Sequence, residues 1–218
     1  MSSQEPKKRK PFSRRGFMQG VGVGSAATGL LVGPESAEAQ SNSQGNVAAF
    51  GPAAVPITLQ VNGRPLKTSI EPRETLLDTL RNKFDLTGAK RVCDRGTCGA
   101  CTVLIDGKVQ YSCTVFAIDA QNKQIATIES LTANGKMHPI VPAFVNNDAQ
   151  QCGYCTPGFV MAAKGFLDRN PNPTYDQVKD GLGGNLCRCG TYVGVRKAVL
   201  EAAKALRAAN TLSGVTNA

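Results

Sequence analysis

Eight cysteines are the residues of this sequence that could do chemistry, and all of them lie after residue 90. By spacing they form two sets of four. The first set has the pattern C-x4-C-x2-C-x11-C and consists of Cys93, Cys98, Cys101 and Cys113. The second set has the pattern C-x2-C-x31-C-x-C and consists of Cys152, Cys155, Cys187 and Cys189. Four thiolates can hold an iron–sulfur cluster or a zinc ion, and four thiols can also form disulfides.

The spacing of the first set favours a 2Fe–2S cluster, because its first three cysteines follow the plant-type ferredoxin pattern. Gly96 and Gly99 stand beside these ligands, where backbone N–H groups must come close to the bridging sulfides. In the second set, each pair of cysteines comes just before an expected helix, and a helix N-terminus favours the charge of a thiolate. The two pairs would meet if these helices packed side by side.

Zinc and disulfides are the alternatives for these cysteines. C-x2-C is a common zinc half-site, but C-x-C and C-x4-C-x2-C match the usual zinc spacings poorly. Four disulfides would require local pairs within GTCGAC and LCRC, and cysteines two residues apart rarely reach good disulfide geometry. The spacing therefore favours two iron–sulfur clusters.

The elements around the first set predict a small α+β sheet domain over residues 56–131. The expected elements are hairpins over 57–70 and 102–113, a helix over 71–82 and a strand over 124–128. The hairpin turns are placed at Asn62-Gly63 and Asp106-Gly107, because these dipeptides tolerate the positive φ angles of tight turns.

The elements around the second set predict four helices in a second domain over residues 132–210, followed by a tail over 211–218. Their signals are Pro139 near the start of the first helix, Thr156 as a possible N-cap of the second, a capping box of Thr174 and Gln177 with a stop at Gly183-Gly184 for the third, and an apolar stripe over 192–209 for the last.

The first 39 residues look like an export signal. A basic segment is followed by a glycine-broken apolar stretch and by Ala37-Glu38-Ala39 as a cleavage site. SRRGFM, residues 13–18, resembles the twin-arginine signal, which exports proteins already folded around cofactors. The apolar stretch is too short to span a membrane. We therefore expect a twin-arginine signal peptide over 1–39, a flexible leader over 40–55 and a periplasmic location, where prior folding weakens the usual link between an even cysteine count and disulfides.

The formal charge of +9 would suggest a nucleic-acid or membrane partner. The basic residues after the leader are scattered and have no interleaved aromatic residues, so nucleic-acid binding is not expected. A 2Fe–2S core with four thiolates carries a charge of about −2. Several basic residues beside the cysteines could compensate this charge, namely Lys90, Arg91, Arg95 and Arg188.

With both sets in view, the chain resembles the iron–sulfur subunit of the xanthine oxidase family of molybdenum hydroxylases. The motifs that carry the resemblance are CDRGTCGACTV with YSC, QCGYCTPG and NLCRCGTY, and it covers about residues 56–206. Together with the leader it points to the exported bacterial aldehyde oxidoreductases, which have iron–sulfur, flavin and molybdenum subunits. The resemblance implies an N-terminal β-grasp, ferredoxin-like domain followed by an all-α four-helix-bundle domain.

The resemblance also implies roles for individual residues. The first set would hold the cluster nearer the flavin, and the second set the cluster beside the molybdopterin. Gln151 would hydrogen-bond the pterin, and the sulfur of Cys189 would contact its amino group. An aldehyde would be oxidised on a separate molybdenum subunit, and its electrons would pass over both clusters to an FAD subunit or a cytochrome. This chain is expected to contribute no catalytic residue, since it offers no phosphate-cradling motif and no evident base besides His138.

Other functions stay open at this point. The same subunit could serve a hydroxylase of nitrogen heterocycles or purines, or the chain could be a free-standing exported electron carrier. A disulfide-stapled binding module is a further alternative and predicts a protein without iron. Relatives often read GTYPRIR where this chain reads GTYVGVR, at residues 190–196, and this departure leaves the identity of the partner less certain than the clusters.

Overall fold

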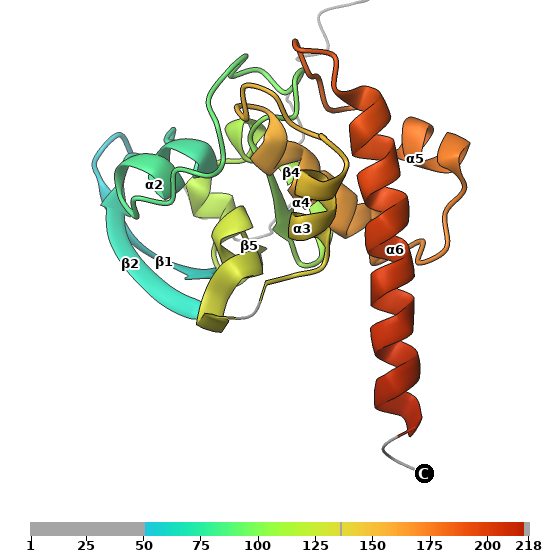
Figure 1. Cartoon of the computed structure of the whole chain (residues 1–218). Helices are drawn as coiled ribbons and strands as arrows, with labels where there is room; N and C mark the ends of the chain where they lie inside the picture. Colours follow the sequence, from blue (N-terminus) through green and yellow to red (C-terminus); the bar gives the residue numbers. More distant parts are fainter. Residues whose placement is uncertain (1–50, 136, 216–218) are drawn as a thin grey trace, which may run out of the picture. The chain divides into compact units, whose positions relative to one another are not determined.

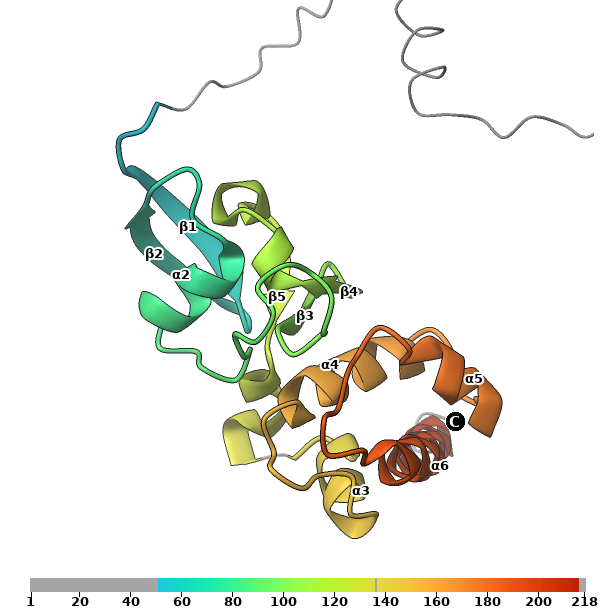
Figure 2. The ribbon, with the colours of Figure 1, turned by 90° about the horizontal axis from the view of Figure 1, so that it is seen from above.

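The computed structural model describes residues 51–135 and 137–215, and the expected signal peptide and most of the expected leader lie outside this part. The described residues belong to one compact unit of the chain. They form a five-stranded mixed sheet with one α-helix and three short 3-10 helices, followed by four α-helices (Figure 1). Figure 2 shows the strands and helix α2 on one side and helices α3 to α6 on the other.

The sheet contains both expected hairpins. Its strands are β1 (Val55–Val61), β2 (Arg64–Ile70), β3 (Thr102–Ile105), β4 (Lys108–Tyr111) and β5 (Gln124–Ala126), in the spatial order β2-β1-β5-β3-β4. The turn residues have the positive φ angles that the sequence predicts, 52° at Asn62, 76° at Gly63, 50° at Asp106 and 74° at Gly107. Strand β5 pairs in parallel with β1 and antiparallel with β3, so it joins the two hairpins into one sheet.

Helix α2 (Leu76–Asn82) covers the sheet and starts later than the expected helix over 71–82. Leu76, Leu77 and Leu80 are fully buried in one hydrophobic cluster with residues of β1, β3 and β5. The helix cannot start earlier because Thr75 has an extended backbone and its hydroxyl accepts the N–H of Asp78 as an N-cap. The α+β class is therefore confirmed for this part, while the start of the helix was wrong.

Four helices follow the sheet, as the sequence predicts. They are α3 (Ile140–Asn146), α4 (Thr156–Leu167), α5 (Tyr175–Gly181) and α6 (Tyr192–Val215). Pro139 occupies the N-cap position of α3, and the capping box of Thr174 and Gln177 is present in α5. Helix α6 is longer than the expected helix over 192–209 and continues over residues 210–215, which contain no proline that would end it.

Two other details of the sequence prediction were wrong. Thr156 is the first residue of α4 and its hydroxyl has no hydrogen-bond partner, because the N-cap position is taken by Cys155. Strand β5 ends at Ala126, and a 3-10 helix over Ile128–Gly135 replaces the end of the expected strand over 124–128.

Helix α4 lies directly on the sheet and on the loop that carries the first cysteines. A Cβ atom on Gly165 would lie 2.7 Å from Cδ2 of Leu104 in β3, and one on Gly158 would lie 2.3 Å from the carbonyl oxygen of Gly99. Only glycine permits these approaches. The first turn of α4 is therefore held against the first cysteine loop.

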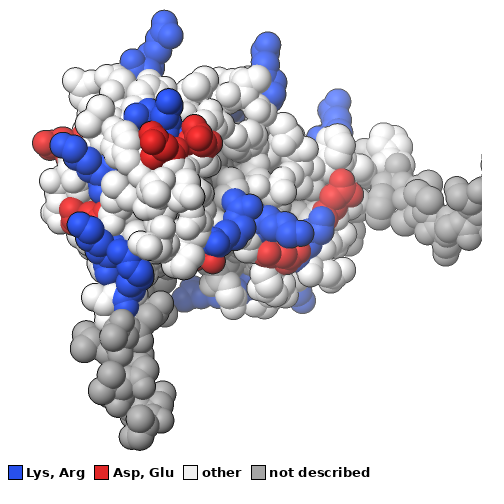
Figure 3. Space-filling model, turned by 90° about the vertical axis from the view of Figure 1, so that its right-hand side faces the viewer, with Lys and Arg blue, Asp and Glu red and all other residues white. Residues whose placement is uncertain are grey.

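The charged surface shows no large patch of one sign on the face drawn in Figure 3, where Lys and Arg side chains lie singly or in small groups with Asp and Glu among them. Within residues 51–135 and 137–215, no helix has the length and apolar character that a membrane crossing requires.

Candidate metal centres

The first set of cysteines is brought together by one loop and by the turn that follows β4. Cys93, Cys98 and Cys101 lie on the loop, and Cys113 lies in a short 3-10 helix at the end of the second hairpin. Cys98, Cys101 and Cys113 are buried, while Cys93 is half-buried. The sulfur of Cys98 contacts that of Cys93, and the sulfur of Cys101 contacts that of Cys113. The four sulfurs thus form two contacting pairs.

Backbone N–H groups of the loop point at these sulfurs. The N–H of Gly96 donates to Sγ of Cys113 over 3.3 Å, and the N–H of Thr97 donates to Sγ of Cys93 over 3.4 Å. Gly96 has a φ of 71°, and a Cβ atom there would lie 2.8 Å from Cγ2 of Thr114. The glycine therefore lets the loop wrap closely around the sulfurs, as the sequence predicts.

The thiols of the first set differ in pKa. Burial by itself would raise the pKa of Cys93, but hydrogen bonds from Thr97 and Arg95 lower it to about 6. Burial and the neighbouring thiol of Cys101 raise the pKa of Cys113 to about 11. Backbone donors thus stabilise one thiolate, and a second negative charge beside it is opposed by burial and repulsion.

The second set is assembled from the starts of two helices. Cys155 is the N-cap of α4 and Cys152 comes three residues earlier, while Cys187 and Cys189 lie on the turn that leads into α6. The pairs cross between the two segments, because Cys152 contacts Cys189 and Cys155 contacts Cys187. The helices therefore do bring the two halves of the set together, as their position in the sequence suggests.

The helix starts stabilise Cys187 more than its partner. Burial opposes its thiolate, but the hydroxyl and the backbone N–H of Thr191 lower its pKa to about 7. The hydroxyl of Thr191 lies 3.2 Å from Sγ of Cys187, and the hydroxyl of Tyr192 accepts the N–H of Cys187 over 2.9 Å. Burial, followed by the Cys187 thiol, raises the pKa of Cys155 to about 12.

Both sets fit a two-iron cluster better than a single metal ion. Each set offers two thiol pairs, which is what two irons with two thiolates each require. Two thiolates in contact repel each other unless a cation lies between them. The donor type, the pairing and the N–H groups all suit such a cluster.

The two sets lie next to each other. The N–H of Leu186, beside Cys187, donates to the carbonyl of Cys98 over 2.9 Å. The hydroxyl of Tyr154 donates to the carbonyl of Arg91 over 3.2 Å. An apolar hollow of about 390 Å³ contains cysteines of both sets in its wall, namely Cys98, Cys152, Cys155 and Cys187. The two candidate centres thus adjoin at one place, the junction where the loop of the first set contacts the segments of the second.

The basic residues beside the cysteines have several different contacts. Arg91 pairs with the carboxylates of Asp78 and Asp94, so much of its charge is already compensated. Arg95 donates to the carbonyl of Cys93, and the ammonium of Lys90 lies 6.0 Å from the ring centre of Tyr154. Compensation of cluster charge therefore falls less on Arg91 than the sequence suggests.

The residues expected to contact a pterin lie at the open side of the second set. Gln151 and Cys189 are exposed, and so is Cys152. The motif NLCRCGTY also contains Asn185 and Tyr192, to which sequence reasoning gave no role, although Asn185 is buried and Tyr192 binds the backbone of Cys187. The position of an asparagine two residues before a ligand was the signal that could have revealed the first of them.

Two domain families match this chain. The family described as 2Fe-2S iron-sulfur cluster binding domain matches residues 59–128, and the family described as 2Fe-2S binding domain matches residues 127–200. Each match contains one complete set of cysteines.

Similar proteins include subunits of several oxidoreductases. One subunit of nicotinate dehydrogenase from Pseudomonas putida is 46% identical over 151 residues, which cover 69% of this chain and 96% of the relative. The aldehyde oxidoreductase iron-sulfur-binding subunit PaoA of Escherichia coli is 36% identical over 207 residues, which cover 88% of each chain. Among solved structures, a chain of quinoline 2-oxidoreductase from Pseudomonas putida 86 has a TM-score of 0.64 and 39% identity, and the match covers 69% of this chain and 96% of that one.

Proposed function

Because the chain belongs to the xanthine oxidase family of molybdenum hydroxylases as an iron–sulfur subunit, we propose that it carries electrons within an aldehyde oxidoreductase. The observation that carries this proposal is the arrangement of eight thiols as two adjacent sets, each made of two contacting pairs. When bound, each 2Fe–2S cluster takes up and releases one electron at a time.

Each domain would hold one cluster. We assign Cys93, Cys98, Cys101 and Cys113 to the domain over 56–131, and Cys152, Cys155, Cys187 and Cys189 to the domain over 132–210, whose four helices we interpret as the four-helix bundle of the family. The N–H groups of Gly96 and Thr97 and the hydroxyl of Thr191 stabilise negative charge on the sulfurs. These donors would raise the reduction potentials of the clusters.

The open side of the second set is the proposed contact with the molybdopterin of a large partner subunit. Gln151 and Cys189 are exposed there, where an amide and a sulfur can reach a pterin held by another chain. An FAD subunit, or a cytochrome, would accept electrons from the first set. The names of the relatives as subunits support a hetero-oligomer.

An aldehyde is the proposed substrate of the complex, and a nitrogen heterocycle is the second candidate. The match with PaoA is longer than the whole described part of this chain, so it reaches into the leader, whereas the match with nicotinate dehydrogenase covers 151 residues. The higher identity to the nicotinate enzyme favours the second candidate. Rates of the purified complex with aldehydes and with nicotinate or quinoline would decide between them.

Export through the twin-arginine pathway to the periplasm is proposed from residues 13–18 and 37–39. Replacement of both arginines, Arg14→Lys with Arg15→Lys, should keep the chain in the cytoplasm with its signal peptide uncleaved. Cell fractionation measures the outcome, and a processed periplasmic form of the double variant would refute the assignment.

The proposed function is tested by purifying the full-length chain from its native host and measuring its metals and partners. We expect about four Fe per chain, two for each cluster, together with molybdenum and larger co-purifying chains. Cys113→Ser and Cys187→Ser should each lower the iron to about two per chain, whereas Thr114→Ala, an exposed neighbour of Cys113, should not. Iron without molybdenum or larger chains would indicate a free carrier, and a colourless protein with cystines would indicate a binding module.

A further inference from the structure

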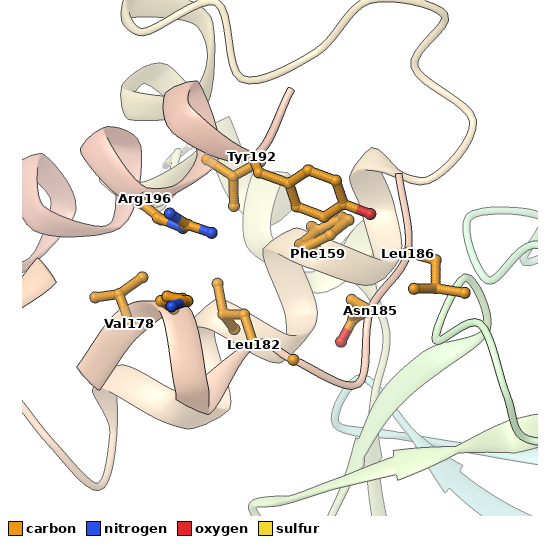
Figure 4. A pocket seen from close by; sticks show the side chains of 10 residues that line it. Phe159, Val178, Leu182, Asn185, Leu186, Tyr192 and Arg196 are labelled. Atoms are coloured by element: carbon orange, nitrogen blue, oxygen red, sulfur yellow. The ribbon is translucent and has the colours of Figure 1, made fainter. Parts of the chain in front are cut away.

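Asn185 is a buried polar residue at the junction of the two cysteine sites. The residue is 5% exposed, and its side-chain amide nitrogen donates to the carbonyl of Gly99 over 2.9 Å and to Oγ1 of Thr102 over 3.3 Å. Figure 4 shows Asn185 at the end of a cavity between the helices, next to the strands of the sheet. A buried amide in this place needs such partners, since an unpaired one is unfavourable.

The acceptor of this hydrogen bond is part of the first cysteine loop. Gly99 lies between Cys98 and Cys101, and its carbonyl also accepts the hydroxyl of Thr102 over 2.6 Å. A Cβ atom on Gly99 would lie 2.6 Å from the amide nitrogen of Asn185. The loop and the asparagine therefore fit each other so closely that neither can shift alone.

Asn185 is also part of the second cysteine segment. The next residue, Leu186, donates its N–H to the carbonyl of Cys98, and Cys187 follows. Two consecutive residues of the second segment thus bind two consecutive carbonyls of the first loop, at Cys98 and Gly99. This double contact fixes the register of one ligand segment against the other.

The segment that carries Cys152 and Cys155 leads into a helix that packs against the same carbonyl, that of Gly99. The first turn of α4 packs on Gly99, where a Cβ atom on Gly158 would lie 2.3 Å from the carbonyl oxygen. Cys155, the N-cap of α4, comes three residues before Gly158. Both chain segments of the second set, the one before α4 and the one before α6, are therefore held in place against Gly99. Asn185 is the side chain that hydrogen-bonds the Gly99 carbonyl.

We infer that Asn185 is a positioning residue that sets the distance between the two cluster sites. Its amide binds Gly99 and Thr102, so it acts through the loop and the segment that carry the ligands. The inference rests on the proposed function, because it concerns two centres that exchange electrons. Supporting hydrogen bonds of this kind hold functional groups within about 0.5 Å of their working geometry.

The test is the magnetic interaction between the two clusters in the full-length chain, reduced with dithionite and measured by electron paramagnetic resonance at low temperature. The dipolar part of this interaction falls with the cube of the distance, so it reports small separations. Asn185→Asp keeps the size of the side chain but directs a carboxylate oxygen at the carbonyl of Gly99. We expect the splitting of the electron paramagnetic resonance signals to be smaller and broader than in the unaltered chain, with the iron content unchanged.

Asn147→Asp is the matched control. The amide of Asn147 donates to the carbonyl of Ala143 over 2.9 Å and to Oε2 of Glu201 over 2.6 Å, between α3 and α6. The same substitution there places two carboxylates together and lowers the melting temperature, but the hydrogen-bond partners that it disturbs, Ala143 and Glu201, lie outside both ligand segments. We expect the splitting of this variant to equal that of the unaltered chain.

An equal splitting in Asn185→Asp and Asn147→Asp would overturn the inference. If Asn185→Asp does not retain both clusters, Thr102→Val takes its place, because it removes the second acceptor of Asn185 and one of the two hydrogen bonds to the carbonyl of Gly99, while the hydrogen bond from Asn185 to that carbonyl remains. An unchanged splitting in that variant would overturn the inference as well. An unaltered chain that lacks iron–sulfur signals would instead refute the proposed function, so the two failures are distinguishable.

Discussion

The two sets of cysteines reach the same composition in different ways. Three members of the first set lie on one loop, and eleven residues separate Cys101 from Cys113 at the end of a hairpin. The second set joins the starts of α4 and α6, with 31 residues between Cys155 and Cys187. The first site therefore depends on local turns, and the second depends on how two helices pack.

The two sites also differ in exposure. Cys98, Cys101 and Cys113 are between 2% and 8% exposed, whereas Cys152 and Cys189 of the second set are exposed. Buried ligands keep water away from a metal site, so the surrounding protein sets its reduction potential. Exposed ligands can contact a partner protein directly. The difference is consistent with an electron-transfer subunit in which the second site faces another chain.

Gly99→Ala should have the largest effect, because Gly99 belongs to the loop of the first site and touches the segment of the second. Its φ is 69°, and a Cβ atom would lie 2.8 Å from the carbonyl oxygen of Gly184. Overpacking of about 1–3 kcal/mol adds to left-handed strain of about 1–2 kcal/mol. We expect both sites to lose iron, measured as iron per chain.

Gly153→Ala is the control for the backbone strain. Gly153 has a φ of 78°, and a Cβ atom there would have no neighbour within 4 Å, so only strain of about 1–2 kcal/mol is expected. The first site should keep its iron in this variant. Full iron in both sites of Gly99→Ala would show that the two sites are less dependent on each other than their contacts indicate.

Gly194→Ala should affect the second site and leave the first site unchanged. A Cβ atom on Gly194 would lie 2.5 Å from the carbonyl oxygen of Asn147 and 2.8 Å from that of Asp148. The start of α6 must move, at about 1–3 kcal/mol. The second site should lose iron and the first should retain it, which spectra of the reduced chain can distinguish.

Gly183→Ala is the matched control, since its Cβ would meet only the carbonyl oxygen of Asp180 at 3.3 Å among close contacts. We expect both sites to keep their iron in that variant. Equal loss from both sites in Gly194→Ala would contradict the view that helix packing matters mainly for the second site.

Tyr192→Phe should weaken the second site without emptying it. The substitution removes the acceptor of the Cys187 N–H, and an unsatisfied buried donor costs about 1–3 kcal/mol. The urea midpoint of the bleaching of the second cluster should fall. Tyr111→Phe, which removes a more exposed hydrogen bond to the carbonyl of Gly184, should have a smaller effect.

Thr174→Ala should have the smallest effect on the clusters. It breaks the capping box of α5, and an N-cap contributes about 1 kcal/mol to stability. The melting temperature should drop by a few degrees, while the iron content and the spectra of both clusters stay the same. Loss of iron from the second site would mean that α5 supports the ligands more directly than its contacts show.

Local signals explain what could be predicted from the sequence. Asn62-Gly63 and Asp106-Gly107 placed both hairpins, Thr174 with Gln177 placed the start of α5, and the cysteine spacing indicated two clusters. Each of these signals acts within a few residues, so it survives without knowledge of the rest of the fold.

The errors lie where competing local signals were close together. The helix over 71–82 was started too early, since Thr75 and not an earlier residue caps it. Thr156 was taken as a cap because threonine is a good one, but the chain turns one residue earlier, at Cys155. Only the backbone conformation decides between such neighbours.

The sequence by itself determined the two sets of candidate iron ligands, because ligand type and loop spacing are chemical properties of the chain. Only the tertiary structure decided that Cys152 pairs with Cys189, that Cys155 pairs with Cys187, and that Asn185 is buried between the two sites. These contacts join segments far apart in sequence. They depend on the close approach of helices and loops at a few glycines. The need for glycine at these positions cannot be seen from the sequence, because the atoms that a Cβ would meet belong to distant residues.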